Sequence, residues 1–177
     1  MEYYFDFSDC EPLTISQDDL TVLNRLHELS SQYGNEYAIA IIDGVEMKEF
    51  TSELSDRVHI PDELRETGNV RLFHSHTIET PLSPSDLVFL SWPSVDDICV
   101  ITKERSVFRV LVNGGIKPDT GEYIEMTDGL DDEVNFEIMG HPCFEDWDYD
   151  VRNYMATKEQ MIRTARLFKW RLEGGRI

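Results

Sequence analysis

The sequence has few basic residues and no long apolar segment. Its 177 residues include 16 Lys and Arg against 35 Asp and Glu, which gives a formal net charge of −19. A surface this acidic repels nucleic-acid phosphates and anionic membranes, so neither is an expected partner. The longest apolar run, residues 37–42, is much shorter than the roughly 18 residues that a membrane-spanning helix needs.

Cysteine is also scarce. Cys10, Cys99 and Cys143 are widely spaced and include no CxxC pair. An odd number of isolated thiols is typical of a reducing compartment, where cysteines stay free. The acidic N-terminal residues lack the positively charged region of a signal peptide. We therefore expect a cytoplasmic protein without disulfide bonds, and 41% hydrophobic residues are enough for a globular core.

Hydrophobic periodicity predicts a mixed α/β domain in the first part of the chain. An amphipathic helix is expected over residues 16–32, where Ser16 and Asp19 have the spacing of a capping box. Short helical segments are expected at 62–66 and 83–91. Strands are expected at 2–7, 36–42, 47–51, 70–73, 97–102 and 107–112. This order predicts layered helices and strands around a single core.

The composition changes after residue 115. Residues 119–150 hold twelve acidic and no basic side chains, and residues 151–177 hold seven basic and two acidic ones. The last segment thus carries +5, which leaves −24 for residues 1–150 because −24 + 5 = −19. The acidic stretch lacks the spacing of a calcium loop, so it is either a solvated face or a docking surface for a basic partner.

Within this second part, strands are expected at 123–126 and 134–139. A final amphipathic helix is expected to begin at Thr157 and to end at the glycine pair 174–175 as its C-cap. We expect this basic helix to pack against the acidic body. The predicted organisation is thus a core at 1–115 and, at 116–177, an acidic C-terminal extension with a basic amphipathic helix on the same domain.

One segment carries metal-ligating side chains at a suggestive spacing. Residues 73–87 read FHSHTIETPLSPSDL, and strand alternation places His74 and His76 on one face. Ser83 and Asp86 have the capping-box spacing of a following helix. Each pattern alone is ordinary, but together they offer two imidazoles and a carboxylate. Three such ligands leave a fourth tetrahedral position open, as catalytic zinc sites do.

The segment resembles the JAMM (MPN-type) metallopeptidase family, whose motif is an upstream Glu followed by His-x-His-x7-Ser-x2-Asp. The resemblance implies an α/β (α+β) sandwich in which a curved mixed β-sheet, flanked by helices, carries the histidines. It implies that His74, His76 and Asp86 bind Zn²⁺ and that Ser83 helps to stabilise the oxyanion. The family's catalytic Glu begins the first long buried strand, and Glu36 in the segment EYAIAIIDG matches that position.

The match covers about residues 16–113 and departs from the family pattern in two ways. Six residues separate His76 from Ser83 where the family has seven, and Thr77 replaces the usual Pro. Glu46 and Glu49 are the other candidates for the general base.

These observations predict a zinc metallopeptidase, a small standalone member of bacterial or phage type. By resemblance it is an isopeptidase or deubiquitinase-like hydrolase whose protein substrate is a candidate ubiquitin-like conjugate. The alternative is an acidic protein-binding module, inhibitor- or immunity-like, on the same scaffold. Either function suits a neutral or basic protein partner. A homodimer or a heterodimer is compatible with both functions. A role at DNA is a third interpretation, opposed by the net charge and favoured by the basic final helix.

Overall fold

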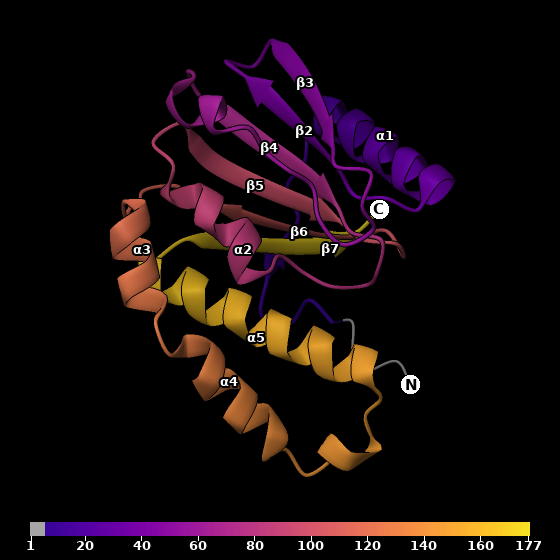
Figure 1. Cartoon of the computed structure of the whole chain (residues 1–177), viewed down its shortest axis with the longest axis vertical. Coiled ribbons are helices and arrows are strands. Elements are labelled where there is room, and N and C mark those ends of the chain that lie inside the picture. Colours follow the sequence, from indigo (N-terminus) through magenta and orange to yellow (C-terminus); the bar gives the residue numbers. More distant parts are fainter. Residues whose placement is uncertain (1–5) are drawn as a thin grey trace.

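One mixed seven-stranded sheet forms the centre of the computed structural model, which describes residues 6–177 (Figure 1). The strand order is β1-β7-β6-β5-β4-β2-β3, in which the β1–β7 and β4–β5 pairs are parallel and the other pairs antiparallel. The strands are β1 (Glu11–Pro12), β2 (Tyr37–Ile42), β3 (Glu46–Thr51), β4 (Val70–Ser75), β5 (Val95–Ile101), β6 (Ser106–Leu111) and β7 (Arg171–Arg176). The helices are α1 (Gln17–Tyr33), α2 (Pro84–Leu87), α3 (Thr120–Thr127), α4 (Leu130–Met139) and α5 (Tyr149–Phe168), with 3₁₀ turns η1 (Asp62–Glu66), η2 (Val88–Ser91) and η3 (Phe144–Asp146). None of these helices is long and apolar enough to cross a membrane.

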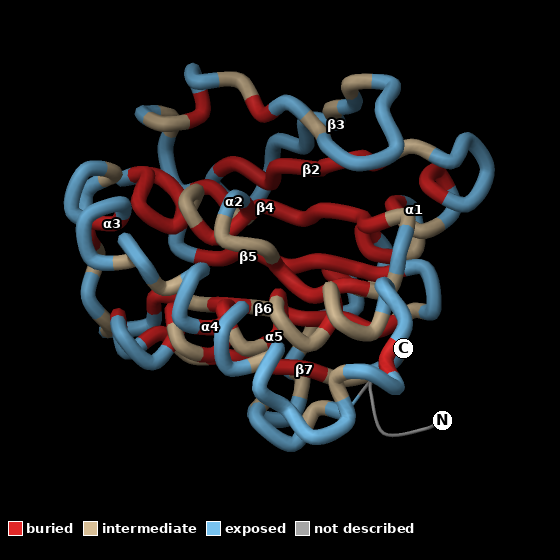
Figure 2. Tube along the Cα trace, turned by 60° about the horizontal axis from the view of Figure 1, so that its bottom comes forward, coloured by how far each residue is buried: buried red, intermediate tan, exposed pale blue. Residues whose placement is uncertain are grey.

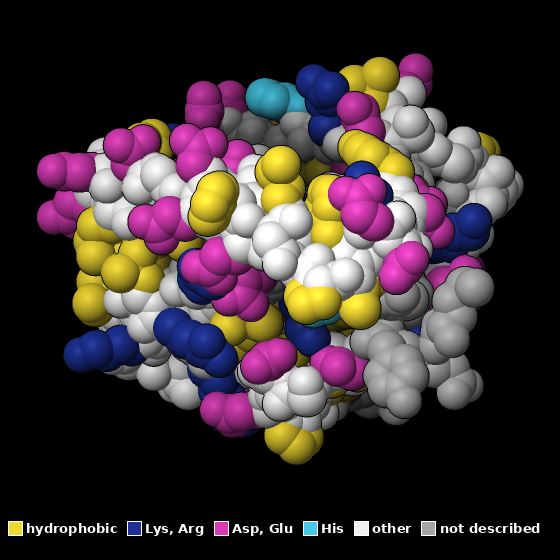
Figure 3. All heavy atoms as spheres, turned by 90° about the horizontal axis from the view of Figure 1, so that it is seen from below, with side chains coloured by type: hydrophobic (Ala, Val, Ile, Leu, Met, Phe, Trp, Pro, Cys, Tyr) yellow, Lys and Arg dark blue, Asp and Glu magenta, His cyan; other side chains and the backbone are white. Residues whose placement is uncertain are grey.

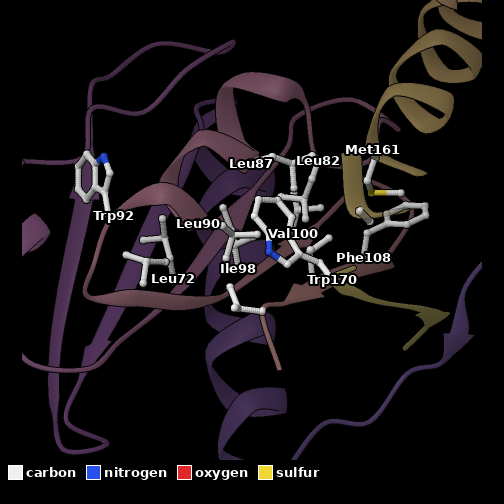
Figure 4. Close-up of a cluster of buried hydrophobic side chains, with 14 of the residues drawn as sticks. Leu72, Leu82, Leu87, Leu90, Trp92, Ile98, Val100, Phe108, Met161 and Trp170 are labelled. Carbon is white, nitrogen blue, oxygen red and sulfur yellow. The ribbon is translucent and has the colours of Figure 1, made fainter. Parts of the chain in front are cut away.

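Helices cover both faces of the sheet, so its central strands are buried (Figure 2). Helix α1 packs on one face, where its leucines meet Ile39, Phe73 and Ile101. Helices α2 and α5 lie on the other face, over a larger cluster that is shown in part in Figure 4. That cluster includes Leu72, Leu82, Leu87, Leu90, Ile98, Val100, Phe108, Met161 and Trp170. The structure is therefore a mixed α/β fold with two hydrophobic layers, one on each side of the sheet.

Most elements of the first 115 residues follow the sequence prediction. The capping box of Ser16 and Asp19 is present at the start of α1, and Gly34 ends that helix in the left-handed conformation with φ 71°. The turn after β2 joins it to β3 in the expected hairpin. The expected strand at 2–7 falls largely on residues outside the described part of the chain, and residues 6 and 7 are not in a strand.

The two strands expected in the acidic stretch are wrong, because residues 123–126 and 134–139 lie in α3 and α4. Asp119 caps α3 by accepting a hydrogen bond from the Glu122 amide, while the Glu122 carboxylate accepts one from the Asp119 amide. This is the Asp-x-x-Glu form of a capping box. Three acidic residues in the first turn of α4 interact favourably with the helix dipole. These end signals determine the structure more strongly than the short apolar alternation.

The C-terminal segment also differs from the prediction. Helix α5 begins at Tyr149, well before the expected Thr157, because Asp148 caps it by accepting a hydrogen bond from the Val151 amide. Lys169 ends α5 in a left-handed conformation, and the chain then returns as β7. The expected glycine C-cap is wrong, since Gly174 lies within β7, where a Cβ atom would be 2.6 Å from Phe7 Cδ1. The chain thus ends in a strand between β1 and β6.

Basic side chains of the C-terminal segment form ion pairs with acidic residues near the N-terminus. Lys158 forms ion pairs with Asp6 and Asp9, at 2.7 and 3.5 Å. Arg171 pairs with Glu11 and with the buried Glu173. The pairs of Lys158 and of Arg171 with Glu11 link α5 and β7 to the N-terminal segment.

A network of charged residues attaches α1 to the sheet. Arg71 of β4 donates hydrogen bonds to Asp19 Oδ1 at 2.7 Å and to Asp97 Oδ2 at 2.9 Å. Burial of Asp19 opposes its ionisation, but the Ser16 amide and Arg71 outweigh burial and lower its pKa from the ordinary 3.8. A lowered pKa in the folded state means that the charged form stabilises the fold, and that this stabilisation is lost as pH falls through the folded-state pKa.

Asp19→Asn is therefore expected to lower the free energy of unfolding at pH 7 by about 2 kcal/mol, the usual scale for a charge-assisted hydrogen bond. The difference from the wild type should shrink as pH falls below about 4, because the wild type then loses the same charge. Urea unfolding at several pH values measures the loss of stability at pH 7 and its decrease at low pH. Asp18→Asn, at the exposed neighbouring position, should change stability by less than about 1 kcal/mol. An equal loss in the two variants would contradict the role of the network.

Candidate metal centre

The candidate site lies where β2 begins and β4 ends. These strands are antiparallel, with Ala38 opposite His74. Continuing this register by two residues in each strand places Glu36 opposite His76. Side chains two residues apart share a face of the sheet, so Glu36, His74 and His76 all project toward the side that α2 and α5 cover. Ser75 points the other way, and its hydroxyl accepts a hydrogen bond from the Tyr37 amide.

Four buried side chains converge at this point. His74 Nε2 lies 3.2 Å from Glu36 Oε2, and His74 Nδ1 lies 3.3 Å from Asp86 Oδ1. His76 Nε2 lies 3.5 Å from Asp86 Oδ2. The two imidazole rings are nearly perpendicular, with centroids 4.7 Å apart and an interplanar angle of 88°. His74 thus lies between the carboxylate of Glu36, just before β2, and that of Asp86 in α2, while His76 contacts Asp86.

Asp86 is held by the start of α2. The Ser83 amide and hydroxyl both donate hydrogen bonds to Asp86 Oδ2, each at 2.7 Å. The Asp86 amide in turn donates to Ser83 Oγ at 3.3 Å, which completes the expected capping box. The capping box has two roles here. It begins the helix, and it fixes a buried carboxylate toward the histidines.

The loop between His76 and Ser83 supports the site although it is one residue shorter than the family pattern. His76 Nδ1 lies 2.8 Å from the Thr80 carbonyl oxygen, which can only accept a hydrogen bond, so Nδ1 carries the proton. Nε2 then has the free lone pair that a metal ligand needs, as in most metal-binding histidines. Thr77, at the position of the family's Pro, donates to the Ser55 carbonyl at 2.6 Å and joins the loop to the segment after β3.

The charges at the site favour a cation. Among the described residues, no Lys or Arg forms an ion pair with Glu36 or Asp86, and the basic side chains that contact these carboxylates are His74 and His76. Burial by itself lowers the pKa of His74, but Asp86 and Glu36 outweigh burial and raise it to about 9. Burial of Asp86 is likewise outweighed by the histidines, which hold its pKa well below the usual range. In the metal-free protein a proton on His74 therefore compensates the carboxylates, and metal binding would release it.

The residues present fit a divalent metal ion. Glu36, His74 and His76 each offer a ligand atom, and these atoms lie within 4.8 Å of one another. Two carboxylates with two neutral imidazoles carry a charge of −2, which a divalent cation neutralises. Asp86 is outside this group of three but contacts both histidines. Two sets of metal ligands are therefore possible: His74 and His76 with Glu36, or the same histidines with Asp86.

The site opens into a cleft of about 580 Å³. Its walls include Arg57 and Val58 from the segment after β3, Phe89 after α2, and Asn153 and Thr157 from α5. Asn153 and Thr157 were not among the residues predicted for the site. Their spacing of four predicts a shared helix face, but only the packing of α5 on the sheet brings that face to the cleft.

All five residues predicted for the site, Glu36, His74, His76, Ser83 and Asp86, line this one cleft. The other candidates for a general base lie elsewhere. Glu46 and Glu49 are exposed on β3, where they pair with Lys48 and Arg25. The catalytic and ligand roles of the five residues remain predictions.

Comparisons of the chain with protein-family models, with curated proteins and with solved structures find no match.

Proposed function

We propose that the chain is a zinc-dependent hydrolase that cleaves amide bonds, a metallopeptidase of the JAMM type. The observation that carries the proposal is the convergence of His74, His76, Asp86 and Glu36, all buried, in one open cleft. Two histidines with one carboxylate form a typical ligand set for catalytic zinc, which keeps one position open. The ligand order and the strand–loop–helix context support the family assignment.

His74, His76 and Asp86 would hold the ion. Zinc supplies a Lewis acid that polarises a carbonyl group and favours ionisation of water. Glu36 has no Lys or Arg partner among residues 6–177, so its carboxylate can take the proton of the attacking water and return it to the leaving amine. The Ser83 hydroxyl, which donates to Asp86 Oδ2 in this structure, would rotate away from that carboxylate to donate a hydrogen bond to the oxygen that becomes negative in the tetrahedral adduct. Ser83 Oγ also lies 2.8 Å from Ser85 Oγ, which offers a second hydroxyl at the same edge.

The cleft and the charge support a protein as the proposed substrate. The cleft of about 580 Å³ is lined by the segment after β3 and by α5, which suits a polypeptide segment as its ligand. The chain's charge of −19 favours a neutral or basic protein substrate. An isopeptide bond to the C-terminal Gly of a ubiquitin-like protein is the substrate that the family resemblance supports.

Metal analysis tests this proposal. The purified protein is expected to carry about one zinc ion per chain by mass spectrometry, and His74→Ala to carry less than about a tenth of that. The wild type should release amine from a peptide whose Lys side chain bears a Gly-Gly unit, and a chelator should stop this release. Absence of zinc in the wild type, or unchanged zinc in His74→Ala, would refute the site.

A further inference from the structure

Helix α4 exposes apolar side chains on the side that faces away from the molecule. Its inner side carries Val134, which is fully buried against α5. Phe136 and Met139 point outward and are 80% and 65% exposed. They are three residues apart and hence neighbours on one helix face. Single exposed apolar residues are common on protein surfaces, so their meaning depends on what surrounds them.

The surroundings are acidic and carry little compensating charge. Asp132 and Glu133 precede Phe136 by four and three residues, so both are its neighbours on the helix surface, one turn nearer the N-terminus of α4. Of the twelve carboxylates in residues 119–150, the one that forms an ion pair with a Lys or Arg of the described chain is Glu137, with Arg163. Figure 3 shows the end of the molecule to which α4 contributes, with hydrophobic side chains among Asp and Glu. This combination is a surface whose apolar centre is flanked by Asp132 and Glu133, neither of which forms an ion pair among the described residues, although Glu133 lines a pocket with Arg163 and Arg166.

We propose that this outward face of α4, formed by Asp132, Glu133, Phe136 and Met139, docks a basic amphipathic helix of a partner protein. Apolar residues of the partner would cover Phe136 and Met139, and its Lys or Arg side chains would meet the flanking carboxylates. Aromatic and Met side chains are enriched at the centres of protein interfaces, with charges at the rim. A second copy of this chain does not fit, since it would bring the same negative charge to the contact.

The docking face is separate from the candidate metal centre. Helix α4 packs on α5, and none of its residues lines the cleft that holds the histidines. The proposal therefore does not depend on hydrolysis, and it can hold or fail independently of the proposed function.

Fluorescence anisotropy with labelled peptides tests the proposal on the full chain. The probe is a synthetic amphipathic helix of Leu and Lys. Its controls are a scrambled peptide of the same composition and a Leu–Glu helix. The wild type is expected to bind the Leu–Lys helix at least about tenfold more tightly than either control. Phe136→Ser with Met139→Ser should weaken this binding at least about tenfold. Asp132→Asn with Glu133→Gln should weaken it at low salt, and that difference should shrink near 0.5 M salt, where the Debye length falls to roughly 4 Å.

The matched control replaces two exposed apolar side chains elsewhere on the surface. Val45→Ser with Met47→Ser alters two residues of the β2–β3 hairpin that are 88% and 63% exposed, and it should leave binding unchanged. Equal losses in the two double variants would overturn the proposal, and so would equal binding of the scrambled peptide. Unchanged binding by the Phe136 and Met139 variant would also overturn it. A dimer in sedimentation experiments that dissociates in that variant would instead identify a second copy as the occupant.

Discussion

Replacing Asp86 with asparagine should weaken zinc binding by at least about 100-fold. Loss of a partner behind a metal ligand typically costs 10- to 100-fold in affinity, and loss of a charged ligand should cost at least as much. Asparagine keeps an oxygen that can accept from the Ser83 amide, so the start of α2 should persist. Competition with a fluorescent zinc chelator measures the dissociation constant, and thermal unfolding checks that the variant is folded.

Asp56→Asn is the matched control for Asp86→Asn. Asp56 lines the same cleft but pairs with Arg57 instead of a histidine, so its loss should leave zinc affinity within about threefold of the wild type. The opposite pattern is equally informative. If Asp86→Asn kept its zinc and Glu36→Gln lost it, the ligands would be Glu36, His74 and His76, and the roles assigned to the two carboxylates would have to be exchanged.

The part of the site that could be predicted from the sequence is the part determined by local structure. Strand alternation placed His74 and His76 together, and a capping box placed Asp86 at the start of a helix. Glu36 came from the family resemblance. The structure adds a physical reason for its position, because the β2–β4 register continues to Glu36 opposite His76. The contribution of α5 to the cleft depends on packing between segments far apart in the chain, which no local pattern encodes.

The errors in the fold prediction have a similar origin. Residues 123–126 and 134–139 were too short for periodicity to distinguish a strand from a helix. The capping residue Asp119 was the helix signal for α3, and the acidic first turn was the signal for α4, which has no side-chain cap. In the last segment, the helix was expected to continue to the glycine pair 174–175, although it ends at Phe168. The two glycines of β7 weaken its local preference for the strand conformation. This strand forms because β1 and β6 pair with it on its two sides.

Glu36→Gln should abolish most hydrolysis and leave zinc in place. Loss of a general base typically lowers the rate by about 10²–10⁴-fold. The substitution is nearly isosteric, and the Glu36 amide keeps its hydrogen bond to the Leu54 carbonyl, so β2 should be unaffected. Zinc affinity should stay within about threefold of the wild type, because Asp86 and not Glu36 is the proposed ligand. Steady-state hydrolysis of the Gly-Gly-lysine peptide, with zinc content measured on the same sample, gives both quantities.

Glu49→Gln provides the comparison for Glu36→Gln, since it neutralises an exposed carboxylate on the neighbouring strand β3, outside the cleft. It should hydrolyse the peptide at the wild-type rate. Full activity in Glu36→Gln would show that another group takes the proton. If the wild-type protein binds zinc but cleaves no amide substrate, the site binds a metal without acting as a peptidase. Glu36 would then contribute its charge to the binding of the ion through His74, and Glu36→Gln should lower zinc affinity through that contact.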